Sequence, residues 1–153
     1  MNAEKNKFII SIKGLQTYED DDKNDTDISL LTEAEFEYNN GAYFIDYEES
    51  ELTGLEGTKT SIEIGDNYVS LQRSGTVNTN MLFMKDRKTS SYYNTPYGDM
   101  QIDIFTDYLN IDVTPKGGKI NVDYFIDINN LSTGKNNFEI EIKQTEIAPM
   151  SRA

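Results

Sequence analysis

Cysteine and histidine are both absent from this chain of 153 residues. Without cysteine there can be no disulfide framework, no thiolate metal site and no cysteine nucleophile. Without histidine the chain lacks the commonest metal ligand and the usual general base near neutral pH. Ser-His-Asp and Cys-His catalytic arrangements are therefore excluded within the chain. An enzyme is the least favoured class of function, and we predict no catalytic residues, no metal site and no cofactor.

Basic character and long apolar runs are lacking as well. The formal net charge is −13, from 27 acidic and 14 basic residues. Such a surface repels phosphate groups, so nucleic acid and anionic membranes are poor partners. No run approaches the roughly 18 apolar residues of a membrane-spanning helix, and the first residues hold no apolar signal segment. We therefore expect a cytoplasmic protein, and the missing cysteines fit a reducing compartment.

What the chain does contain is alternation of polar and apolar side chains. The clearest case runs from Glu33 to Gly75 and turns at Asn39-Asn40-Gly41, where Asn and Gly tolerate the positive φ of a tight hairpin. A period of two places successive side chains on opposite faces, so this stretch is predicted to be β-sheet with one solvated face.

Further alternating runs of the same kind cover most of the chain. The predicted strands are residues 7–15, 30–39, 42–51, 58–64, 68–73, 76–85, 97–106, 108–114, 120–129 and 138–147. Many short antiparallel strands indicate a sandwich or a closed barrel, and closure removes exposed strand edges. We expect one all-β domain over residues 1–153, a single antiparallel up-and-down barrel of about 8–10 strands. Residues 18–27 are expected to form an acidic exposed loop, 86–93 a polar connection, 132–137 a turn and 148–153 a frayed tail.

Several segments, taken in order, resemble the YwiB-like family of small bacterial proteins of unknown function. The matching segments are Ile10-x-Ile12, Tyr43-x-Ile45-x-Tyr47-x-Glu49-x-Glu51, Gly54-x-x-Gly57-Thr58-x-Thr60, Arg73-x-Gly75, Thr95-Pro96-Tyr97-Gly98, Gly118-x-Ile120-x-Val122-x-Tyr124 and Asn137-Phe138-x-Ile140-x-Ile142. The resemblance covers nearly the whole chain and implies a calycin-type, lipocalin-like barrel of eight or more strands. It implies no established activity and supplies no catalytic residues.

Arg73 is the most informative single residue, because it shares parity with Val69 and Leu71 and should point inward. Glu49 and Glu51 share parity with the apolar positions of their own strand. A buried guanidinium needs a carboxylate, so we predict an ion pair between Arg73 and Glu49 or Glu51 near one mouth of the barrel. The pair could anchor a polar group of a ligand; a purely structural pair is the alternative.

Other acidic clusters carry less weight. Carboxylates such as Glu48 and Glu56 are so plentiful that a glycosidase-like pair would arise by chance. Asp20-x-Asp22-x-Asn24 begins like a calcium loop, but the sixth and twelfth positions hold Asp25 and Leu31 instead of the required Gly and Glu. Neither cluster supports a dedicated catalytic or metal site.

Three of the ten tyrosines complete the candidate site. Tyr47 and Tyr124 are expected to face the interior, and Tyr97 to lie in a loop over the barrel mouth. We predict non-enzymatic binding of a small molecule in or at the mouth of the barrel, by Arg73, Glu49 and Glu51 with these tyrosines. The alternative is a protein-interaction module whose barrel is filled by side chains. Whether the protein is a monomer or a homodimer stays open.

Overall fold

The structure, a computed structural model, describes residues 7–14, 29–49, 56–75, 78–95 and 98–144, and every regular element among them is a β-strand. The strands are β1 (Lys7–Lys13), β2 (Ser29–Asn39), β3 (Ala42–Glu48), β4 (Thr58–Ile64), β5 (Tyr68–Gly75), β6 (Thr79–Met84), β7 (Lys88–Thr95), β8 (Gly98–Thr114), β9 (Gly117–Ile128) and β10 (Leu131–Gln144). The described part of the chain holds no helix of the length and apolarity needed to cross a membrane.

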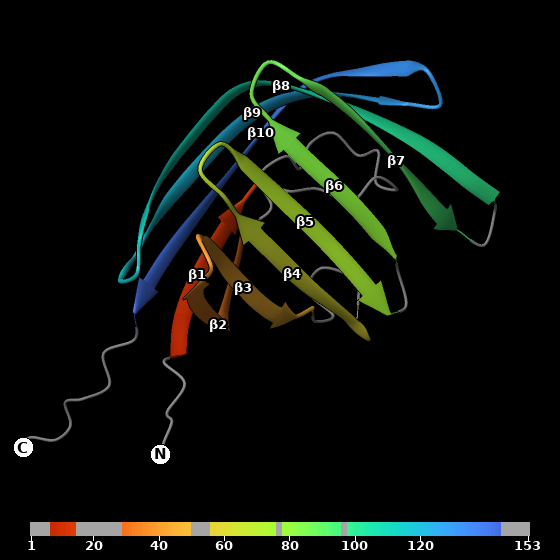
Figure 1. Ribbon diagram of the computed structural model, residues 1–153. Helices are drawn as coiled ribbons and strands as arrows, with labels where there is room; N and C mark the ends of the chain where they lie inside the picture. Colours follow the sequence, from red (N-terminus) through yellow and green to blue (C-terminus); the bar gives the residue numbers. More distant parts are fainter. Residues whose placement is uncertain (1–6, 15–28, 50–55, 76–77, 96–97, 145–153) are drawn as a thin grey trace, which may run out of the picture.

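The ten strands form one antiparallel sheet in the order β6-β5-β4-β3-β2-β1-β10-β9-β8-β7. Two up-and-down meanders, β1 to β6 and β7 to β10, are joined by the pairing of β1 with β10. The sheet curls until a bridge between Lys85 and Thr106 brings the end of β6 to β8. The result is a nearly closed barrel (Figure 1), which confirms the predicted all-β, up-and-down architecture.

The interior of the barrel is filled mainly by the apolar side of each alternating strand. In β9, for example, Ile120, Val122, Tyr124 and Ile126 are all buried. The rings of Phe83, Tyr124 and Phe138 meet edge to face, with centroids 5.1–5.9 Å apart. Edge-to-face aromatic contacts of this kind add to the stability gained from burial.

The predicted hairpin turn is present, and it fixes the register of β2 against β3. Asn40 and Gly41 have φ of 52° and 87°, the left-handed values that a two-residue hairpin turn requires. Asn39 consequently lies opposite Ala42, and pairing continues to Glu35 opposite Asp46.

Three local predictions are wrong. Lys88–Thr95 is strand β7 rather than a polar connection, because backbone pairing with β8 holds it along its whole length. Residues 98–114 form one strand, β8, interrupted only by a bulge at Asp107. The turn predicted over 132–137 belongs to β10, whose register shifts between Ser132 and Lys135. The predicted acidic loop and terminal tail lie outside the described residues.

Candidate functional site

A row of four polar side chains crosses the interior near one end of the barrel. The strands β3 to β6 each contribute one residue, and each residue lies opposite the next: Tyr47, Thr60, Arg73 and Thr79. All four are more than nine-tenths buried. Polar residues are rare on the buried face of a strand, so this row marks the one end of β3 to β6 where the apolar pattern gives way.

Glu49 joins this row just beyond the end of β3, where its backbone N–H donates to the carbonyl of Thr58 at 2.9 Å. Its carboxylate lies 3.5 Å from Nε of Arg73, and the side chains are 1% and 8% exposed. The hydroxyl of Thr60 donates a hydrogen bond to the same carboxylate oxygen. The ion pair predicted for Arg73 is therefore present, with Glu49 as its partner.

Like Thr60, Tyr47 interacts with the ion pair of Arg73 and Glu49. Burial raises the pKa of its phenol above the ordinary value of 10, and the negative charge of Glu49 raises it further. The charge of Arg73 and a hydrogen bond with Thr60 act in the opposite direction but do not cancel the effect. Tyr47 is therefore a neutral phenol at every physiological pH, and its O–H donates a hydrogen bond to the carboxylate of Glu49.

Two polar atoms of the row have no hydrogen-bond partner. They are Nε of Arg73 and Oγ1 of Thr79, and both are sealed from solvent. At 3.5 Å the contact of Nε with Glu49 is an ion pair rather than a hydrogen bond. Buried polar groups are nearly always satisfied, so two unsatisfied atoms on facing residues are unusual and call for an explanation.

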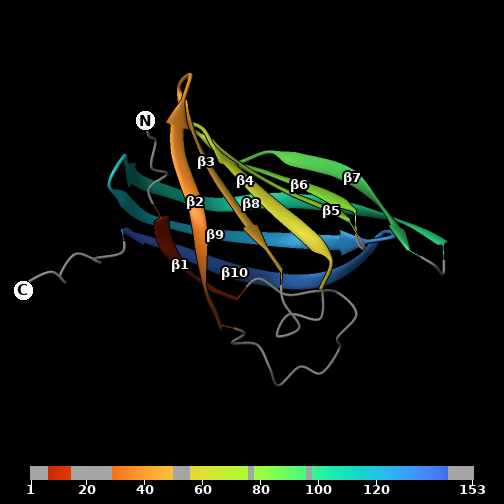
Figure 2. The ribbon, with the colours of Figure 1, turned by 90° about the horizontal axis from the view of Figure 1, so that it is seen from below.

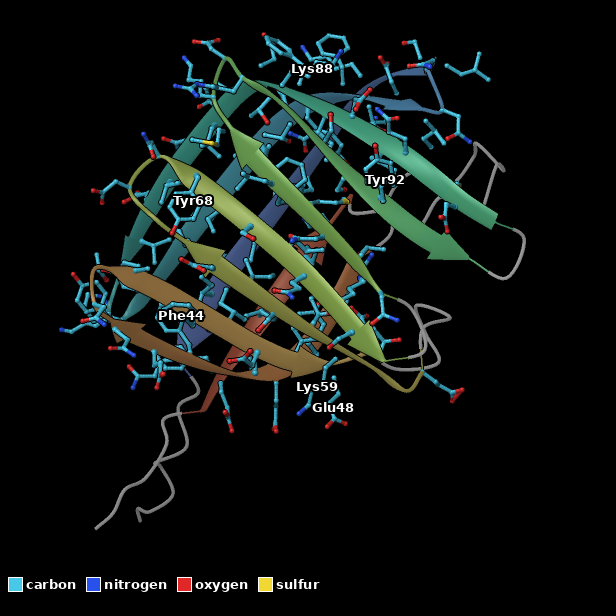
Figure 3. All side chains as sticks on the ribbon, turned by 45° about the vertical axis from the view of Figure 1, so that its right-hand side comes forward. Phe44, Glu48, Lys59, Tyr68, Lys88 and Tyr92 are labelled. Carbon is cyan, nitrogen blue, oxygen red and sulfur yellow. The ribbon has the colours of Figure 1, made fainter. Side chains whose placement is uncertain are left out.

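A pocket of about 420 Å³ opens at the end of the barrel beside Glu49. Its lining residues are Glu48, Glu49, Gly57, Thr58, Lys59, Ser74 and Gly75. We call this opening the mouth pocket. Glu48 and Lys59, which are cross-strand partners, lie side by side on its rim (Figure 3). Small-molecule sites have volumes of about 300–1,000 Å³, so the mouth pocket has a suitable size.

Gly75 is required at the rim of the mouth pocket. Its φ is +128°, and a Cβ at this position would collide with the backbone carbonyl of Gly57, the residue directly before β4. The close approach of these two backbones lets β4 and β5 end together beside Thr58, which is itself buried.

Of the remaining predicted site residues, only Tyr124 lies in the described part of the chain, and it does not join this cluster. Tyr124 faces the interior as expected, but its ring packs on Phe83 and Phe138 in the aromatic core. Glu51 and Tyr97 lie outside the described residues. The described residues contain no group of three or more acidic side chains placed to hold a metal ion.

Three threonines of the site were missed by sequence reasoning: Thr58, Thr60 and Thr79. The signal for two of them was available, because Thr58 and Thr60 share the inward parity of Ile62 and Ile64. Threonine is common in strands of every kind, so its presence at inward positions did not distinguish a site.

The comparisons with known proteins agree with this architecture. A protein-family model described as "Domain of unknown function (DUF1934)" matches residues 10–140. The chain belongs to this family. Its structure is similar to the crystal structure of the ywiB protein from Bacillus subtilis, with a TM-score of 0.72 and 19% sequence identity over 93% of this chain and 94% of that chain. The YwiB-like resemblance is thus confirmed, and at this identity the likeness shows the fold alone. No curated protein matches the chain.

Proposed function

We propose that the protein binds a small polar molecule, without catalysis, at the mouth pocket of its barrel. The observation that carries the proposal is the buried pair of Arg73 and Glu49, with its unsatisfied donor, directly behind this pocket. The calycin-like architecture is compatible with the proposal, because small barrels are either filled by side chains or hold one small ligand.

The ion pair supports a binding role because it is an inefficient way to stabilise a barrel. Taking two charges out of water costs several kcal/mol per ion, and well-packed apolar residues at such positions are often equally or more stable. Most of the rest of the interior is made of such apolar residues, with the buried Thr106 on β8 as an exception. Positions at which a chain departs from its own packing pattern are often functional.

The chemistry of the mouth pocket favours a ligand with several hydrogen-bonding groups. The rim offers the carboxylate of Glu48, the ammonium of Lys59 and the hydroxyl of Ser74, and Glu49 lines the pocket with a side chain that is only 1% exposed. Nε of Arg73 is sealed, so Arg73 acts as a positioning residue that holds Glu49 rather than as a direct contact. We expect ligands rich in hydroxyl or amino groups.

The proposal can be tested by screening small polar metabolites with thermal shift and measuring each hit by calorimetry, since a ligand that binds only the folded state raises Tm. The test variant is Glu49→Gln with Arg73→Met, which removes both buried charges and keeps side-chain volume. The matched control is Glu141→Gln with Lys143→Met, which removes an exposed pair 3.8 Å apart on β10.

The test variant should remain folded and lose the hits, while the control should retain them. A folded test variant that binds every hit with unchanged Kd would show that the pair is only structural. If no compound in a broad library binds the natural protein, the proposed function is wrong.

A further inference from the structure

Among the described residues, the pairing of β2 with β3 stops before either strand ends. The two strands pair from their hairpin as far as Glu35 opposite Asp46. Both strands continue beyond that point, to Ser29 and to Glu48, without further pairing between their described residues. Figure 2 shows β2 and β3 spreading apart from the hairpin toward their far ends. Each strand keeps its other neighbour, β1 or β4, so two strand edges face each other across the opening.

A groove of about 470 Å³ lies in this opening. Its lining residues are Glu33, Ala34, Glu35, Asp46, Tyr47, Glu48 and Lys59. We call it the wall groove. It shares Glu48 and Lys59 with the mouth pocket but is otherwise built from different residues. Four carboxylates and one ammonium line it, so its surface is strongly negative.

The charges of the wall groove explain why the strands part. The register set by the hairpin already places Glu35 opposite Asp46, and its continuation would place Glu33 opposite Glu48. Like charges directly opposite on paired strands are destabilising. Charge repulsion therefore disfavours pairing at the place on β2 and β3 where acidic residues would face each other repeatedly.

We propose that the wall groove binds an extended, basic segment of a partner protein as an added β-strand. An open strand edge presents backbone donors and acceptors that a further strand can pair with, which is the basis of recognition by strand addition. The carboxylates on the outer side select Lys or Arg at alternate positions of the segment. Ala34 and Tyr47 are both buried on the inner side of the groove. They select small apolar residues at the positions of the segment that alternate with the basic ones.

This inference does not rest on the proposed small-molecule function, although the two sites share Glu48 and Lys59. A bound strand would replace the repulsion between Glu33 and Glu48 with attraction to basic side chains of the segment. It would also pair with β2 and β3 beyond Glu35 and Asp46, where the described residues of the two strands no longer pair with each other. The net charge of −13 adds a long-range attraction that speeds the encounter with a basic partner.

The experiment uses a fluorescent eight-residue peptide of alternating Lys and Val, with fluorescence polarisation to measure Kd. Two further peptides separate the contribution of charge from that of backbone hydrogen bonding. One alternates Glu and Val, and the other has the Lys-Val sequence with alternate backbone nitrogens methylated. Methylation keeps the charge of the peptide and removes the N–H donors that strand pairing needs. The protein variant is Glu33→Lys, with Glu139→Lys on the exposed face of β10 as its control.

We expect the Lys-Val peptide to bind, and methylation to weaken Kd by roughly tenfold or more, about 1.4 kcal/mol. Glu33→Lys should weaken binding similarly and Glu139→Lys only slightly, and amide signals of Ala34 and Tyr47 should shift on binding. Equal binding of the methylated peptide would mean that charge alone attracts it, which overturns the inference. Absence of binding by the Lys-Val peptide overturns it as well. Neither result bears on the small molecules tested against Glu49 and Arg73.

Discussion

The coupling between Arg73 and Glu49 gives the sharpest quantitative prediction. The side chains are 8% and 1% exposed, and the charged groups lie 3.5 Å apart. At an effective dielectric constant of about 20, two unit charges at this distance attract by about 5 kcal/mol. Removing one partner of a buried pair leaves the other unpaired and costs about 3–5 kcal/mol.

The predicted pattern is strongly non-additive. Glu49→Gln or Arg73→Met alone should lower Tm by roughly 6–20 °C, since each kcal/mol corresponds to about 2–4 °C for a domain of this size. The double variant should recover most of this loss, because no buried charge is left without a partner. Replacing buried pairs with side chains of similar volume is often neutral or stabilising.

The assay is urea unfolding of the natural protein, both single variants and the double variant, from which the coupling free energy follows. We expect a coupling of about 3 kcal/mol or more. The same cycle on Glu141 and Lys143, an exposed pair, should give less than about 1 kcal/mol. A coupling for Arg73 and Glu49 as small as that of the exposed pair would refute the reasoning that burial makes this ion pair strong.

Further predictions concern single groups elsewhere in the barrel. The raised pKa of Tyr47 means that its contribution to stability is present below pH 10 and lost above it, so Tyr47→Phe should remove one late phenolate from an ultraviolet titration and flatten the alkaline loss of stability. Hydrogen bonds from Ser90 and Gln101 lower the pKa of Asp103 from 3.8, so the stability lost in Ser90→Ala should be largest above about pH 4 and shrink as the pH falls through the folded-state pKa, as measured by urea unfolding at several pH values. Thr79→Val should leave Tm unchanged or slightly higher, because the hydroxyl that it removes has no partner. Gly75→Ala should lower stability by about 1–3 kcal/mol, since its positive φ and its contact with Gly57 exclude a Cβ.

The inward position of Arg73 could be predicted because β5 is regular. Val69, Leu71 and Arg73 alternate without interruption, so parity alone places the guanidinium in the interior. Residue parity also indicates the bulge of β8, although the sequence predicts its two halves as separate strands. Buried Ile102, Ile104 and Thr106 have even numbers, whereas Leu109 and Ile111, which pack against the core, have odd numbers. One inserted residue, Asp107, accounts for that change.

Strand β7 could not be predicted from side-chain patterning. Its sequence from Lys88 to Thr95 is almost entirely polar, and its position depends on backbone hydrogen bonds to β8. Such bonds are independent of side-chain polarity, so a strand at the edge of the sheet order needs no apolar face to be stable. The hydroxyl of Thr89, which donates to the carbonyl of Leu82 at 2.6 Å, links this strand to β6 and helps close the barrel.

The wall groove could be predicted from the sequence only in part. The two-residue turn at Asn40 and Gly41 fixes the register of β2 and β3, so continued pairing would place Glu33 opposite Glu48. What sequence cannot supply is the choice between two costs: keeping the strands paired against charge repulsion, or exposing two backbone edges to water. Each pair of opposed carboxylates costs only about 0.2–1 kcal/mol, so the balance depends on how firmly β1 and β4 hold the outer sides of the two strands. In this barrel both neighbours pair along the whole opening, which frees β2 and β3 to separate without unravelling the wall.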